Sequence, residues 1–168
     1  ALNQPGDVAL GARGRLLVTE SGRHALKAWD GQALSTVAGS VAGFAGDGGP
    51  AAAAQLNSPS GVVADGDATW LMDQGNGRLR RVAGDGTIST VAGGGVDIQI
   101  LGPEPVAPAA YRVSRPQDLT LDPTGRPAWC VPRVNQIHHL LADGRVALVA
   151  GKDGVAGDAG DGGPAAEA

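Results

Sequence analysis

Cysteine, aromatic residues and charge are all scarce in this sequence. Cys130 is the single cysteine, so no disulfide forms within the chain and no paired-cysteine metal or redox motif exists. Aromatic residues make up 3% of the chain, which leaves little to stack on nucleic-acid bases. Charged residues make up 18%, with a net charge of −4, which argues against general binding to nucleic acids or membrane surfaces.

Long hydrophobic runs are missing as well. No apolar stretch approaches the roughly 18 residues that a membrane-spanning helix needs. The 168 residues fit the usual size of one domain, and the 28 glycines and 11 prolines predict a chain rich in turns.

What the sequence does contain is an internal repeat. Three units follow one another, at residues 1–55, 56–111 and 112–168. Pro5, Pro59 and Pro116 occupy equivalent positions in them, and the surrounding motifs recur in the same order. Self-similarity of this kind indicates three copies of one structural unit.

Each unit is predicted to form four short strands separated by glycine-rich turns. The first strands are expected at residues 8–10, 62–64 and 119–121, and the second at 16–18, 70–72 and 128–130. The third strands contain Leu26, Leu79 and Ile137, and the fourth strands carry STVAG or VALVAG. Four strands in a unit of about this length are typical of a propeller blade. In units 1 and 3 a GDGGP tail with alanines follows, where Pro50 and residues 51–56 predict one or two helical turns.

Residues 43–93 carry the strongest family signal. The motifs GFAGDGGPAAAAQLNSPSGVVAD, WLMDQGNGRLRRV and GTISTVAG resemble an NHL repeat, the unit of a class of six-bladed β-propellers. The resemblance covers all three units, although VDIQILGPEPVAP replaces GDGGP in the second tail. It implies an all-β fold of three four-stranded NHL-like blades, half of a six-bladed propeller. Similar Gly/Ala-rich NHL proteins are secreted or periplasmic, and the resemblance implies that location here.

Half of a six-bladed ring would leave two apolar blade faces uncovered. Soluble monomers rarely expose apolar patches of more than a few hundred Å². Ala1 placed directly after Ala168 would continue the repeat without a gap, and two copies related by a two-fold axis would then close a ring. We therefore expect a homodimer of half-propellers. The alternative is a fragment whose second half of the propeller lies outside this sequence.

The loops between the second and third strands are predicted to share one rim with the inter-blade tails. Binding residues often lie on such loops, so this rim is the candidate site for a protein or a small polar ligand. The candidate residues are Arg23, His24, Asn76, Arg78, Arg133 and Asn135. The alternative is that they are solvated turn residues, with Gly and Asn present for backbone shape.

Acidic residues of the tails are weak candidates for calcium ligands. These are Asp47, Asp158 and Asp161, whose spacing does not match a DxDxDG loop. Hydrogen bonding to local backbone is the alternative role for Asp47 and Asp161. No cofactor is therefore predicted, and calcium is left open.

The expected function is a non-catalytic binding or assembly module that completes its ring by self-association. The resemblance implies one alternative, because some six-bladed propellers similar to NHL proteins are lyases or hydrolases with an axial metal. His138 and His139 are consecutive on a predicted strand, so they point to opposite faces and are poorly placed to share an ion. No catalytic serine or metalloprotease motif is visible.

Three further side-chain groups have structural predictions. The cluster of Arg78, Arg80 and Arg81 would be the basis for RNA binding, which is not expected, and Arg78 and Arg80 are predicted on an exposed strand face. Cys130 is predicted to be buried or half-buried. The three tryptophans are predicted to pack between blades: Trp29, Trp70 and Trp129.

Overall fold

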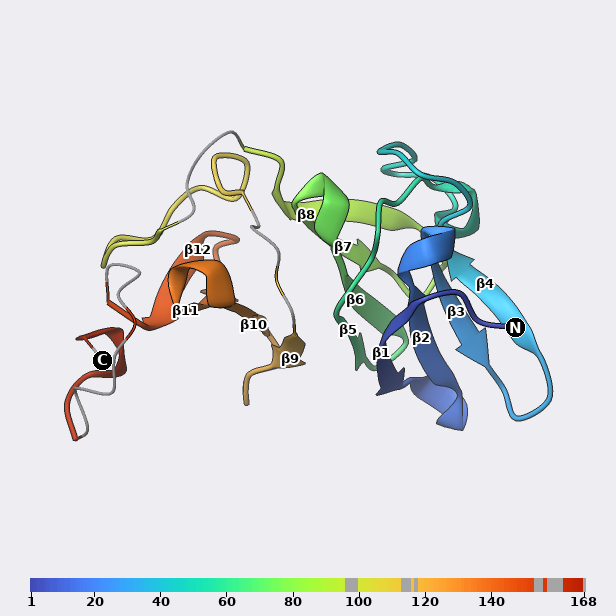
Figure 1. The fold of residues 1–168 in the computed structure, drawn as a ribbon, viewed down its shortest axis with the longest axis horizontal. Coiled ribbons are helices and arrows are strands. Elements are labelled where there is room, and N and C mark those ends of the chain that lie inside the picture. The colour runs from blue at the N-terminus through green and yellow to red at the C-terminus, as the bar shows by residue number, and fades with distance from the viewer. Residues whose placement is uncertain (96–99, 113–115, 117, 153–155, 157–161, 168) are drawn as a thin grey trace.

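The computed structural model describes residues 1–168 apart from 96–99, 113–115, 117, 153–155, 157–161 and 168. Within the described residues, twelve strands form three antiparallel four-stranded sheets, each with its strands in chain order (Figure 1). We call these sheets blades 1, 2 and 3. One sheet therefore forms from each group of four predicted strands.

The strand bounds follow the repeat. Blade 1 contains β1 (Pro5–Leu10), β2 (Leu16–Glu20), β3 (Ala25–Trp29) and β4 (Leu34–Ala38). Blade 2 contains β5 (Val62–Asp65), β6 (Ala68–Asp73), β7 (Arg78–Val82) and β8 (Ile88–Gly93). Blade 3 contains β9 (Leu119–Leu121), β10 (Pro127–Val131), β11 (Gln136–Leu140) and β12 (Val146–Ala150). The predicted first, second and third strands all lie within these bounds.

The described helices are all short 3₁₀ turns. They are η1 (Ala12–Gly14), η2 (Ser21–Arg23), η3 (Ala51–Ala53), η4 (Gln74–Asn76), η5 (Pro132–Val134) and η6 (Ala165–Glu167). In the described part of the chain, no helix has the length and apolar character needed to cross a bilayer. The predicted helix at residues 51–56 is thus only the turn η3, because Ala54 is already extended and Leu56 pairs with Ala42.

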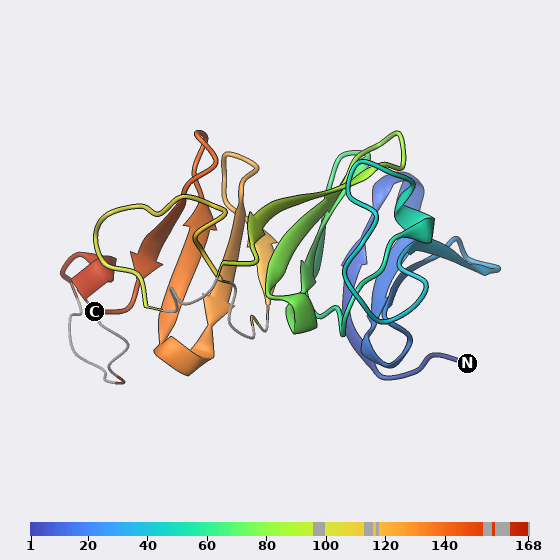
Figure 2. The same ribbon diagram turned by 90° about the horizontal axis from the view of Figure 1, so that it is seen from above.

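The blades are arranged side by side along an open arc. Their first strands, β1, β5 and β9, are neighbours, and the later strands spread outwards from them (Figure 1). The chain termini lie at opposite ends of this arc in both views (Figures 1 and 2). Blade 2 therefore has a blade on each side, whereas blades 1 and 3 each have one.

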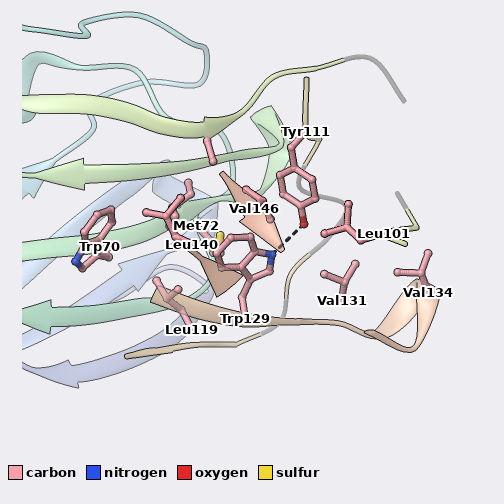
Figure 3. Packing of buried hydrophobic residues seen from close by; sticks show 12 residues of the cluster. Trp70, Met72, Leu101, Tyr111, Leu119, Trp129, Val131, Val134, Leu140 and Val146 are labelled. Atoms are coloured by element: carbon pink, nitrogen blue, oxygen red, sulfur yellow. Dashed lines mark hydrogen bonds between the residues drawn. The ribbon is translucent and has the colours of Figure 1, made fainter. Parts of the chain in front are cut away.

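Two hydrophobic clusters fill the spaces between neighbouring blades. Leu17 and Leu26 of blade 1 meet Leu71 of blade 2 in the first cluster. The second cluster lies between blades 2 and 3 and is built around Trp129 and Met72 (Figure 3). Strand β6 is buried along its whole length, because both of its faces are covered. Its near-continuous apolar sequence, ATWLMD, follows from that position.

A glycine follows or ends the fourth strand of every blade for a steric reason. Gly39, Gly93 and Gly151 all have positive φ values, of 81°, 101° and 93°. A Cβ on each would collide with the carbonyl oxygen of the turn before the third strand. The repeated VAG motif is therefore required by close backbone contact as well as by conformation.

The outward faces of blades 1 and 3 are exposed. On blade 1, Leu10 is 70% exposed and Trp29 is 42% exposed. On blade 3, Cys130 is exposed and Ile137 is 38% exposed, although its repeat equivalents Leu26 and Leu79 are fully buried. The prediction of a buried or half-buried Cys130 is wrong, because its side of the sheet has no neighbouring blade. Inter-blade packing is confirmed for Trp70 and Trp129, which are buried in the second cluster. Trp29 has no neighbouring blade in the described chain and is partly exposed.

Candidate functional site

The three rim loops are tight turns with the same backbone shape. Each is a 3₁₀ turn followed by a left-handed residue, which is His24, Gly77 or Asn135. Their φ values are 53°, 61° and 52°, a region that Gly and Asn adopt most readily. Backbone shape thus explains the Gly and the Asn, while His24 occupies this conformation against its usual preference.

The structure does not gather the six candidate rim residues into one site. Asn76 and Arg78 lie on blade 2, where a tail covers them, as described below. Arg133 and Asn135 are exposed at the η5 turn of blade 3. Arg23 and His24 alone line a common hollow, on blade 1. No described contact tests ligand binding by any of them.

On blade 2 the rim is covered by the tail of the preceding unit, residues 39–55, which we call tail 1. The Asn76 side-chain amide donates a 2.7 Å hydrogen bond to the Gly43 carbonyl. The Arg78 guanidinium lies 3.7 Å from the centre of the Phe44 ring, a cation–π contact. Tail 1 therefore binds to blade 2 through the same rim residues that the sequence marked as binding candidates.

Beneath tail 1 lies a charged network centred on Arg80. One guanidinium nitrogen donates to Asp47 of tail 1 at 2.6 Å, and the other donates to Asp73 at 3.1 Å. Asp73 also accepts hydrogen bonds from the Asn57 backbone and the Asn76 side chain, at 2.7 and 2.8 Å. Burial raises the pKa of Asp73, and these hydrogen bonds and Arg80 oppose that shift. The network fixes tail 1 to blade 2 and leaves each charge with an opposite partner.

The expected exposure of Arg80 is wrong. Its side chain is fully buried, because tail 1 covers the face of β7 that carries Arg78 and Arg80. Arg81 points to the other face, towards Trp70. The three arginines consequently do not form a shared exposed surface on which RNA could lie.

Asp47 has a role that neither sequence interpretation anticipated. It forms the ion pair with Arg80 rather than a local backbone hydrogen bond. Asp158 and Asp161, the other calcium candidates, lie outside the described residues. Among the residues that the structure does describe, no group of three His, Cys, Asp or Glu side chains is close enough to hold a metal ion.

On blade 3 the corresponding position holds a neutral network. The tail of unit 2 (residues 94–111, tail 2) ends at Tyr111. Its hydroxyl accepts a hydrogen bond from Trp129 Nε1 at 3.1 Å (Figure 3). The same hydroxyl lies 2.6 Å from His138 Nδ1. His138 Nε2 lies 2.9 Å from Gln136 Oε1. Gln136 in turn exchanges two hydrogen bonds with the Leu101 backbone of tail 2. Tail 2 lacks GDGGP and binds to blade 3 through aromatic and amide groups instead.

The hydrogen bonds assign one neutral tautomer to His138. Gln136 Oε1 can only accept, so Nε2 carries the proton and Nδ1 accepts from the Tyr111 hydroxyl. Burial lowers the pKa of His138 from 6.5 to about 4. Both ring nitrogens are engaged, which leaves this histidine without a lone pair for a metal. His138 and His139 point to opposite faces, as predicted.

The His138 environment predicts a loss of stability on acidification. The unfolded chain protonates this histidine below pH 6.5, whereas the folded chain does so only near pH 4. Between these values the free energy of unfolding should fall by about 1.4 kcal/mol per pH unit from this group. Urea unfolding at several pH values measures it, and His138→Gln, which does not titrate, is the reference. Equal pH dependence in both proteins would contradict the assignment.

On blade 1 the tail-binding position is open. A hollow of about 620 Å³ lies there, lined by Arg23, His24, Lys27, Thr36 and Val41 among others. Lys27 occupies the repeat position of Arg80, because it pairs with Val18 as Arg80 pairs with Leu71. Its ammonium group donates to Thr36 at 2.6 Å. Blade 1 therefore has the cation of the tail-binding site without a tail.

Comparisons with known proteins identify the fold. No family model matches the chain, and no curated protein matches it in sequence. Among solved structures, virginiamycin B lyase from Staphylococcus aureus, as an inactive variant, superposes with a TM-score of 0.58 at 16% identity, over 86% of this chain and 40% of that one. An auxiliary nutrient binding protein from Bacteroides ovatus gives a TM-score of 0.60 at 15% identity, over 89% of this chain and 37% of that one. A chain of a nidogen/laminin complex superposes with a TM-score of 0.59 at 18% identity, over 88% of this chain and 49% of that one.

The fold is that of β-propeller blades. The chain contributes three of them and spans less than half the length of each of these similar structures. Three blades are half of a six-bladed ring, as the family resemblance implied. At these identities the likeness concerns the fold alone.

Sequence reasoning singled out Asn76 and Arg78 but missed the polar position that the tail-binding sites share. The third strand of every unit carries a polar side chain at one position: Lys27, Arg80 or His138. A polar residue repeated at this position, opposite the apolar cross-strand partners Val18, Leu71 and Trp129, signals a buried partner. The partner itself comes from the preceding unit, which the strand pattern does not reveal.

Proposed function

We propose that this chain is a non-catalytic binding and assembly module of the NHL class, and that two copies pair to complete a six-bladed ring. The observation that carries this proposal is the pair of apolar faces at the two ends of the arc. Each has the composition of an inter-blade surface and lacks its neighbour in the described chain.

The face of blade 1 presents two cross-strand rows of side chains. One row holds Leu10, Leu16, Trp29 and Leu34, and the other holds Val8, Val18, Lys27 and Thr36. Four of the large apolar side chains in these rows are exposed, from 42% for Trp29 to 70% for Leu10. Exposed apolar side chains grouped in this way mark an interaction surface.

The face of blade 3 is complementary in character. Cys130 and Ile137 lie opposite each other on β10 and β11, beside a row that holds Ala128, His139 and Ala147. A shallow apolar hollow of about 130 Å³ is lined by Ala128, Cys130 and Ile137 among others. The large exposed side chains of blade 1 and the apolar hollow of blade 3 suit interdigitation of two copies, each blade 3 against the other copy's blade 1.

Light scattering on the purified chain tests the proposal. The expected mass is twice the 16.6 kDa of one chain. Leu10→Asp, which places a charge in the apolar row, should weaken the dimer at least tenfold, since a buried unpaired charge is strongly unfavourable. Ile100→Asp is the matched control, because Ile100 is 51% exposed in tail 2 and outside both faces. A folded monomer at all concentrations would contradict self-association.

A further inference from the structure

The three blades have one tail-binding site each, in equivalent positions. Lys27, Arg80 and His138 are cross-strand partners of Val18, Leu71 and Trp129, at the middle of each third strand. The sites on blades 2 and 3 are filled by the tails of the units that precede them, through Asp47 and Tyr111. The site on blade 1 is the hollow of about 620 Å³.

Glu20 shows that the site on blade 1 is an incomplete copy of the one on blade 2. Glu20 accepts from the Asn3 backbone at 2.7 Å, just as Asp73 accepts from the Asn57 backbone at the same distance. On Asp73, the second carboxylate oxygen receives Arg80 and Asn76. On Glu20, which is 1% exposed, the second oxygen has no hydrogen-bond partner among the described residues. Blade 1 thus repeats the carboxylate and the cation of the site on blade 2, but among the described residues no acidic group of a tail pairs with Lys27 as Asp47 pairs with Arg80.

The sequence of the last tail fits the open site. Residues 151–168, tail 3, contain the only other GDGGP segment, at residues 160–164. In that alignment Asp161 takes the place of Asp47, and Asp158 takes the place of Phe44. The hollow on blade 1 is lined by two positively charged side chains, Arg23 and Lys27, and by His24, whose Nδ1 accepts a hydrogen bond from the Ser58 backbone at 3.1 Å. An acidic tail thus matches a basic site.

Tail 3 also begins with the same backbone hydrogen bond as tail 1. The Gly151 amide donates to the Ala165 carbonyl at 3.1 Å, and the Gly39 amide donates to the Ala51 carbonyl at 3.0 Å. The described parts of tail 3, residues 151–152, 156 and 162–167, lie at the opposite end of the arc from blade 1 (Figures 1 and 2). A tail 3 bound in the hollow on blade 1 would therefore belong to another molecule.

We propose that the acidic segment 157–164 of a second copy binds in the hollow on blade 1, with Asp161 paired to Lys27 as Asp47 is paired to Arg80. The inference rests on the proposed pairing of two copies and adds its polar contact. Two such contacts, related by the two-fold axis, would set the order of blades around the ring. Apolar faces alone are non-directional and do not fix that register.

A peptide titration tests the tail contact separately from dimerisation. The receptor is the full chain with Asp158→Asn and Asp161→Asn, whose own tail no longer competes. The probe is a fluorescein-labelled peptide of residues 151–168, followed by anisotropy. We expect saturable binding that weakens at least tenfold when the peptide carries the same two substitutions. A peptide with Asp153→Asn, outside the aligned segment, is the matched control and should bind as the unmodified peptide does.

A charge exchange then assigns the pair. Lys27→Asp in the receptor should weaken binding of the unmodified peptide and restore binding of a peptide with Asp161→Lys. If all the peptides bind equally, or if no peptide binds, the tail contact is overturned even where light scattering shows a dimer. Peptide binding to a chain that stays monomeric would support the contact and contradict the proposed self-association.

Discussion

Replacing Arg80 with alanine is expected to lower the free energy of unfolding by about 3–5 kcal/mol, the usual cost of removing one partner from a buried ion pair. The substitution leaves Asp73 buried and without its cation, and it releases Asp47 of tail 1. Chemical unfolding followed by circular dichroism measures the change. Arg80→Lys should recover part of it, since one ammonium group replaces two guanidinium contacts only incompletely.

Arg145 provides a matched control for this experiment. It pairs with Asp143 at 2.7 Å, but both side chains are 50% exposed. Arg145→Ala should therefore change the free energy of unfolding by no more than about 1 kcal/mol. Equal effects at Arg80 and Arg145 would show that the charged network contributes nothing beyond a surface ion pair.

Replacing Trp129 with alanine is expected to cost about 3–5 kcal/mol of stability, as large-to-small substitutions of buried aromatics do. Trp129 is 1% exposed, and its ring centre lies 5.9 Å from that of Tyr111 (Figure 3). The substitution leaves a cavity between blades 2 and 3 and removes the hydrogen bond to the Tyr111 hydroxyl. Urea unfolding followed by circular dichroism measures it.

Trp29→Ala is the paired control for Trp129→Ala. Trp29 is 42% exposed on the uncovered face of blade 1, so under the proposed pairing much of its contribution to stability would come from association. Its effect on unfolding should shrink as the protein is diluted, because stability gained by binding depends on concentration. A loss at Trp29 that is independent of concentration would place it in the core of a single chain.

Much of the fold was predictable because the repeat consists of patterns among residues that are close together in the sequence. Apolar triplets between glycine-rich turns located the strands β1, β5 and β9, and those strands pair with their neighbours in the simplest order. The tight rim turns were also predictable, since Gly77 and Asn135 occupy left-handed positions that few other residues adopt readily.

The errors at Arg80 and Cys130 have one cause. Alternation along a strand says that two residues share a face, but it does not say what covers that face. Arg80 is buried because a tail from the preceding unit lies over it, and Cys130 is exposed because no blade covers its side of the sheet in the described part of the chain. The helical turns expected after Pro50 shortened to η3 for a related reason, since Ala51 and Ala54 are buried between neighbouring units.

The amino-acid pattern alone determined the number of blades, their strands and their turns, because each of these depends on residues close together in the chain. Tertiary structure decided which polar groups are buried and which faces are open, because tails and blades from different units meet there. Lys27 illustrates the difference: its sequence neighbours predict an ordinary strand residue, and only the burial of Arg80, at the equivalent position of blade 2, points to a binding role.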